Sequence, residues 1–94
     1  MQFAIYCTDK PASTDLRAAT RADHLAFIDG YMTNLIIAGP LLSDDGETMI
    51  GSLLIMDFAD LDAAKAFAAA DPYAQAGLFD SVVIRPWKKA LPKN

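Results

Sequence analysis

The sequence SDDGE, residues 43–47, lies between two apolar segments and constrains the fold more than any other feature of the chain. The Asp-Gly pair within it favours a primed turn, which joins two antiparallel strands. We therefore expect a hairpin that pairs 34–42 (NLIIAGPLL) with 51–58 (GSLLIMDF). Pro40 has no backbone N–H to donate to a sheet, so the first of these strands should lie at an edge.

Two further strands and a long helix are predicted outside this hairpin. Segments 3–7 (FAIYC) and 79–87 (FDSVVIRPW) are rich in the aromatic and β-branched residues that favour strands. Residues 15–32 should form a helix, because Ser13 or Thr14 can cap its first turn.

The alanine-rich segment 61–71 predicts a second helix, which Pro72 ends by disfavouring helical geometry at the residue before it. The order is therefore βαββαβ, which is typical of a ferredoxin-like α+β sandwich with two helices on one face of a four-stranded sheet. We expect one domain over residues 1–94, with a loose polar tail at 88–94.

Apolar residues occupy both faces of the predicted strands. In the first strand Phe3 and Ile5 alternate with Ala4 and Tyr6, and 53% of the whole chain is hydrophobic. A sheet with one hydrated face would alternate apolar with polar residues, and two helices can cover only one face. We therefore expect a homodimer that forms through the sheet face opposite the helices.

The charge of the chain argues against two classes of partner. The net charge is −4, and no basic stripe is present, so we expect no nucleic-acid or anionic-membrane binding. The N-terminus does not resemble a signal peptide, no apolar run is long enough to span a bilayer, and the single Cys7 excludes an internal disulfide. A cytoplasmic location is the expectation that follows.

His24, the only histidine, is the first candidate for chemistry. Helical spacing places Arg17, Arg21 and His24 on one side of the first helix, at the border of an apolar stripe that includes Leu25 and Met32. A histidine there can exchange protons near neutral pH, and the two arginines could disfavour its charged form or bind an anionic substrate. The alternative is a border histidine that bonds only to the backbone or to water.

Asp71 is the second candidate, within the sequence Asp71-Pro72-Tyr73. An acidic residue at a helix C-terminus meets the negative end of the helix dipole, which is unfavourable. This placement suggests a task such as accepting the N–H of a histidine. The alternative is a turn, because Asp-Pro commonly opens one.

Other polar residues have simpler interpretations. Asp44, Asp45 and Glu47 could form a metal site, but their Asp-Gly context favours a solvated turn, and we expect no metal. Ser52 has no sequence context of a nucleophile and is interpreted as a strand residue. Cys7 is expected to pack in the core. No cofactor-binding motif is present, so no cofactor is expected.

The chain resembles the YciI-like (YCII-related) proteins in the order of several segments. These are RADHLAF (21–27), AGPLLSDDG (38–46), GSLLIM (51–56), DPYAQAGLF (71–79) and VVIRPW (82–87). The resemblance implies a dimeric α/β barrel similar to muconolactone isomerase. It also implies a His–Asp active-site pair, which maps onto His24 and Asp71, and acid–base chemistry on small cyclic or aromatic-derived molecules.

Our first hypothesis is a small cofactor-free enzyme of the isomerase or lyase type. His24 would act as general acid and base, Asp71 would orient it, and Arg17, Arg21 and Tyr73 would contact substrate. A second hypothesis is a small-ligand-binding module without turnover. A third is a structural dimer, or a partner of a larger enzyme, in which the His–Asp contact only stabilises the fold.

Overall fold

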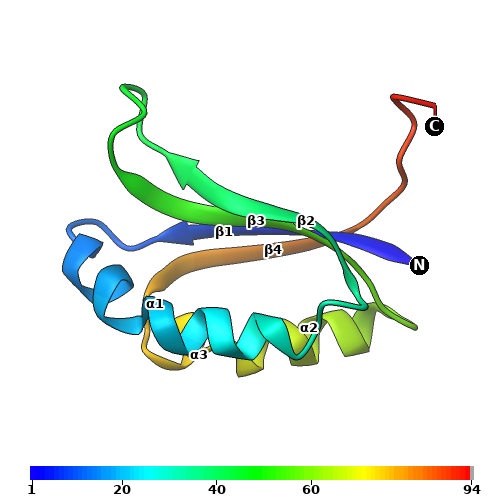
Figure 1. Cartoon of the computed structure of the whole chain (residues 1–94), viewed down its shortest axis with the longest axis horizontal. Helices are drawn as coiled ribbons and strands as arrows, with labels where there is room; N and C mark the ends of the chain where they lie inside the picture. Colours follow the sequence, from blue (N-terminus) through cyan, green and yellow to red (C-terminus); the bar gives the residue numbers. More distant parts are fainter. Residues whose placement is uncertain (94) are drawn as a thin grey trace.

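Four strands form one antiparallel sheet, and three helices lie on the same side of it (Figure 1). The computed structural model describes residues 1–93. Its elements in chain order are β1 (Gln2–Asp9), α1 (Thr14–Asp29), β2 (Leu35–Leu42), β3 (Met49–Asp57), α2 (Leu61–Ala70), α3 (Pro72–Gln75) and β4 (Phe79–Trp87). The strand order is β2-β3-β1-β4, so the α+β prediction is confirmed and the proline-containing strand β2 lies at an edge.

The bounds of two helical regions differ from the sequence expectation. Helix α1 ends at Asp29, three residues earlier than expected, and Gly30 takes the C-cap position. Glycine is a poor helix former, and here its low propensity decides the end. Ser13 takes the N-cap position, but its hydroxyl donates to the carbonyl of Pro11 instead of capping the helix. The short helix α3 was not expected at all.

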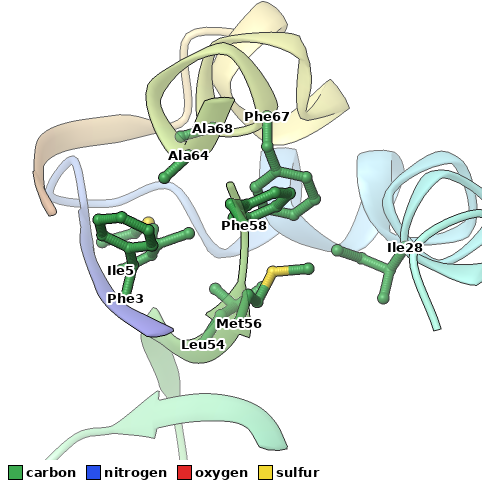
Figure 2. Close-up of a cluster of buried hydrophobic side chains, with 10 residues drawn as sticks. Phe3, Ile5, Ile28, Leu54, Met56, Phe58, Ala64, Phe67 and Ala68 are labelled. Atoms are coloured by element: carbon green, nitrogen blue, oxygen red, sulfur yellow. The ribbon is translucent and has the colours of Figure 1, made fainter. Parts of the chain in front are cut away.

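The main core lies between the sheet and α2. Phe3, Ile5 and Cys7 of β1 point toward the helices, and residues of β3 pair beside them in register. Helix α2 covers this surface with Ala64, Phe67 and Ala68, all buried. In Figure 2 Ala64 and Ala68 lie above Phe3 and Ile5 of β1, and Phe67 lies next to Phe58. Ile28 approaches from α1 at one side. Small alanine side chains therefore let α2 approach the sheet closely.

Helix α1 is placed differently, because it packs mainly against α3 and an aromatic cluster. Phe27 and Tyr31 contact Phe67, with ring centres 5.3 and 4.8 Å apart. We expected the apolar stripe that includes Leu25 and Met32 to adjoin the core. This expectation is wrong, because the two side chains are 48% and 55% exposed. The stripe instead borders a cavity between α1 and the sheet.

The sheet face opposite the helices remains uncovered in the single chain (Figure 1). Tyr6, Ile37, Leu53 and Val83 lie on this face and are 38–66% exposed. The expectation that the helices cover only one face is confirmed. No helix within residues 1–93 is long and apolar enough to cross a membrane. Residues 88–93 form neither helix nor strand, and the rest of the expected tail, residue 94, lies outside the described residues.

Candidate active site

A cavity of about 270 Å³ lies between α1 and the helix-facing surface of β2 and β3. Most of its lining is apolar, including Leu25, Met32 and Leu54. Its polar lining comes from five side chains, Arg17, Arg21, His24, Ser52 and Tyr73. A pocket with apolar walls and a few converging polar groups is the usual form of a small-molecule site.

The structure brings His24 and Asp71 together. Nδ1 of His24 lies 2.9 Å from Oδ1 and 3.1 Å from Oδ2 of Asp71, although the residues are 47 positions apart. The side chain of Asp71 is 5% exposed and that of His24 is 13% exposed. A carboxylate can only accept, so Nδ1 is the donor of this pair and Nε2 is the ring nitrogen left for a ligand. Residues 1–93 offer no hydrogen-bond partner to Nε2.

The backbone around Asp71 explains how this carboxylate is held. Asp71 ends α2 with extended backbone angles, as expected for a residue before proline, and it also caps α3. Its Oδ1 accepts the backbone N–H of Tyr73 at 2.9 Å. Asp71 therefore accepts hydrogen bonds both from the backbone of its own turn and from His24. Either contact can explain an aspartate at this unfavourable position at the end of α2.

The ring of Tyr73 lies between His24 and Arg17. The imidazole stacks on it with centres 4.0 Å apart and planes inclined by 16°, and the Arg17 guanidinium carbon lies 4.6 Å from the ring centre. His24 and Arg17 therefore both pack against the Tyr73 ring. The three side chains form a stack that we call the Arg17–Tyr73–His24 column.

Arg17 is fixed by a network that the sequence did not reveal. Its Nε and Nη2 donate to the two carboxylate oxygens of Asp9 at 2.7 and 3.1 Å, and Nη2 also donates to Oγ of Ser52 at 2.8 Å. The side chains of Arg17 and Asp9 are 6% and 5% exposed. Arg17 lines the cavity, but these partners already occupy most of its donors. A charged residue ending an apolar strand, as Asp9 does, is the signal that could have indicated a buried partner.

Arg21 differs from Arg17 in its exposure and in its hydrogen-bond partners. It is exposed, it lines the cavity one turn before His24, and it makes no hydrogen bond or ion pair within residues 1–93. Of the two arginines, it is the one whose donors are free for a ligand.

Burial and charge set the ionisation of the column. Burial raises the pKa of the Tyr73 phenol above its ordinary value, while the charges of Arg17 and Arg21 oppose this rise. The phenol is therefore neutral at physiological pH. Burial disfavours the charged form of Arg17, but the hydrogen bonds and charge of Asp9 outweigh it and raise the pKa of Arg17. The guanidinium thus keeps its charge inside the fold.

The acidic residues of the β2–β3 turn form a network of their own. Oδ1 of Asp45 accepts the hydroxyl of Ser43 at 2.6 Å and the backbone N–H of Glu47 at 3.0 Å. Within residues 1–93 no group of three or more potential ligands is placed to hold a metal ion. The carboxylate of Asp45 therefore has a role in closing the turn.

The fold and the cavity define a ferredoxin-like protein with a histidine at the mouth of a small pocket. Comparison with known proteins identifies the family within this structural class. The family model of the YCII-related domain matches residues 1–88, and the chain belongs to this family. The protein YciI of Escherichia coli and an uncharacterized protein of Haemophilus influenzae are each 36% identical to it, over 97% of this chain and their full length.

Two solved structures extend the comparison. The 5-chloro-2-hydroxyhydroquinone dehydrochlorinase TftG of Burkholderia phenoliruptrix, in complex with 2,5-dihydroxybenzoquinone, is 34% identical with a TM-score of 0.89. Each chain is covered over 96% of its length. The cofactor-independent oxygenase SnoaB of Streptomyces nogalater has a TM-score of 0.59 at 18% identity, with 98% of this chain and 96% of that one covered. The second likeness concerns the fold alone.

Proposed function

We propose that this protein is a small enzyme that performs acid–base chemistry, of the isomerase or lyase type, on a one-ring oxygenated molecule. His24 is the general base and acid, and Asp71 orients it. The observation that carries the proposal is the free Nε2 of His24 at the cavity, while Nδ1 is held by Asp71. A histidine oriented in this way has a defined tautomer and a base ready for a proton.

The reaction needs one proton acceptor and a substrate with an acidic hydrogen. Nε2 takes a proton from a hydroxyl or from a carbon next to a carbonyl, and the electron pair moves to the carbonyl oxygen as an enolate. The imidazolium then returns the proton to another carbon, which is an isomerisation. Alternatively, an anionic leaving group departs and the imidazolium releases the proton to solvent, which is an elimination. Asp71 stabilises the imidazolium in both cases.

The size and lining of the cavity support a substrate with one ring. A cavity of about 150 Å³ can hold benzene, so 270 Å³ leaves room for a ring with a few substituents. TftG, at 34% identity, is described in complex with a hydroxylated quinone. We therefore propose hydroxyquinones and hydroxyhydroquinones as the first substrate class to test.

The test compares wild type with His24→Ala, Asp71→Asn and the control Asp29→Asn, which changes an exposed aspartate of α1. Candidate substrates include 5-chloro-2-hydroxyhydroquinone and 2,5-dihydroxybenzoquinone, followed by absorbance and by deuterium exchange from solvent. His24→Ala and Asp71→Asn should lower kcat by about 10²–10⁴-fold, and Asp29→Asn should leave it unchanged. Circular dichroism should show all variants folded.

Two other outcomes would support the rival functions. Binding of these molecules by wild type, with neither turnover nor proton exchange, would indicate a ligand-binding module. Neither binding nor turnover, together with a large loss of thermal stability in His24→Ala, would make the His–Asp pair a structural contact.

We also propose that a second copy covers the open sheet face, which carries Tyr6, Ile37, Leu53 and Val83. Leu53→Arg should shift the protein from dimer to monomer in analytical ultracentrifugation at micromolar concentration. The control is Leu16→Arg, because Leu16 on α1 is 37% exposed and Leu53 is 38% exposed. A wild-type monomer with an ordered fold, or dissociation by Leu16→Arg alone, would overturn this proposal.

A further inference from the structure

Ser52 is a polar group of the cavity to which the proposed chemistry has not yet assigned a task. It lies on β3, on the surface that faces the helices, and is 6% exposed. Its Oγ accepts a hydrogen bond from Nη2 of Arg17 at 2.8 Å. Because a guanidinium can only donate, this contact leaves the hydroxyl hydrogen of Ser52 unused. Residues 1–93 provide no acceptor for it.

The position of Ser52 is fixed from two sides. Arg17 is held by both oxygens of Asp9, so the donor that reaches Ser52 cannot easily rotate away. The strand itself is held by Gly51, where a Cβ atom would collide with the carbonyl of Cys7 and lie 2.9 Å from Cδ1 of Leu41. Only glycine allows the strands to approach so closely at this point. A group on such a strand is placed more rigidly than one on a loop.

We propose that the Ser52 hydroxyl donates to the substrate oxygen on which negative charge develops, while His24 handles the proton. This inference rests on the function proposed above and assigns the group in the same site that stabilises the oxyanion. Arg17 is a positioning residue, since it acts through Ser52 by occupying the oxygen lone pair and leaving the hydrogen directed to a ligand. A donor that is already in place stabilises a developing oxyanion without reorganisation.

The surroundings of Ser52 suit an oxygen that gains charge during the reaction better than a fully charged carboxylate, for which the free Arg21 is the better partner. Arg17, the buried cation, is neutralised by Asp9, and Ser52 offers a single neutral donor. The Tyr73 ring contacts both His24 and Arg17, and Arg17 in turn donates to Ser52, so the base and the donor are connected through these side chains. The substrate class is therefore a ring carbonyl or hydroxyquinone whose oxygen gains charge as His24 removes a proton.

The experiment uses 2,5-dihydroxybenzoquinone as the probe, because its ionised and neutral forms differ in visible absorption. Wild type, Ser52→Ala, Ser52→Thr and the control Ser13→Ala are titrated with it. The Ser13 hydroxyl bonds to Pro11 and lies outside the cavity. Ser52→Ala should bind the probe about 10- to 100-fold more weakly than wild type, as expected for loss of a hydrogen bond to a charged group. Ser52→Thr keeps the hydroxyl and should bind within a few-fold of wild type.

A second measurement follows the pH at which the bound probe loses its proton. Removing a donor to the oxyanion should raise this pH in Ser52→Ala by about one unit for each tenfold loss of affinity. A variant that is only less well packed would weaken binding without this shift. Melting temperatures check that each variant is folded.

The outcomes separate the two proposals. If wild type binds the probe and folded Ser52→Ala binds it equally well, this inference fails while the proposed function stands. Equal weakening in Ser52→Thr or Ser13→Ala would also overturn it, because the hydroxyl in the cavity would not be the cause. If wild type neither binds nor converts any hydroxyquinone, the proposed function fails and this inference with it.

Discussion

Helices α1 and α2 lie on the same side of one sheet, yet they meet it in opposite ways. Helix α2 buries Ala64, Phe67 and Ala68 against β1 and closes the core. Helix α1 buries only Arg17 and Ile28, and a cavity remains between it and β2 and β3. The comparison shows how one layered architecture provides both stability and a binding site. Two alanines and one phenylalanine of α2 close one half, whereas α1 is held at two separated points with a cavity between them.

The anchors of α1 differ in chemistry. Near its start the helix is held by the ion pair of Arg17 with Asp9, and near its end by Phe27, which contacts the aromatic rings of Tyr31 and Phe67. Between these points, Arg21, His24 and Leu25 line the cavity. The site therefore occupies the interval that α1 leaves unpacked.

The largest effect on the free energy of unfolding should come from a substitution in the core beneath α2. Phe67→Ala removes a ring that is 3% exposed and should lower the free energy of unfolding by about 3–5 kcal/mol. Leu25→Ala removes a cavity side chain that is 48% exposed, so its cost should stay below about 1 kcal/mol. Urea unfolding measures both values. Equal costs would show that α1 packs as tightly as α2 and would break the comparison.

A smaller effect should separate the two arginines of α1. Arg17→Lys keeps the charge but loses the two-pronged contact with Asp9 and the bond to Ser52, and should cost about 1–3 kcal/mol. Arg21→Lys changes an exposed side chain and should stay within about 0.5 kcal/mol of wild type. Thermal and urea denaturation provide the measurement. A similar cost at both positions would mean that Arg17 does not anchor the helix.

The last prediction concerns pH and Cys7, a buried residue of the core cluster. Burial raises the pKa of this thiol from 9.0 to about 12, with further contributions from the charges of Asp71 and Asp9. The folded state therefore binds the thiol proton more tightly than the unfolded state does. This contribution to stability is complete below about pH 9 and is lost as pH rises toward about 12.

Two measurements check this prediction. The free energy of unfolding should fall more steeply between pH 9 and 11 in wild type than in Cys7→Ala, after both are referred to their values at pH 7. Cys7 should also resist alkylation at pH 8 until the chain is unfolded, because the thiolate is the reactive form. Rapid alkylation of folded protein would indicate that the cavity reaches Cys7.

Local patterns in the sequence predicted the elements of the fold but not its packing. The Asp-Gly turn, the alanine-rich helix and the proline of β2 act through short-range preferences, so they could be interpreted without a structure. The length of α1 was overestimated, because its apolar spacing continues past Gly30 while the helix does not. Spacing alone could not tell whether Leu25 and Met32 face a core or a cavity.

The candidate site shows a similar division. Helical spacing indicated that His24 lies near a boundary, whereas Asp71 was connected to a histidine by its unfavourable place at a helix end and by the family resemblance. The fold brings the two within hydrogen-bond distance, and their catalytic role stays a prediction. Ser52 was missed as a member of the site, because a single serine in a strand has no local signature. Asp9 was missed as well, because its place at the end of an apolar strand indicates a buried partner without identifying it. Their partnership exists only through Arg17, from a third element.

The two anchors of α1 also bear on how such a site can change over evolutionary time. Positions 21, 25 and 32 line the cavity from exposed sites that contribute little to the core. Substitutions there alter the shape and charge that a ligand meets, while Arg17 and the aromatic cluster continue to hold the helix. The exposed residues that shape the cavity and the residues that anchor α1 are thus largely different. In a chain of 94 residues, substitutions that change ligand binding can therefore accumulate at these positions without prior stabilisation of the fold.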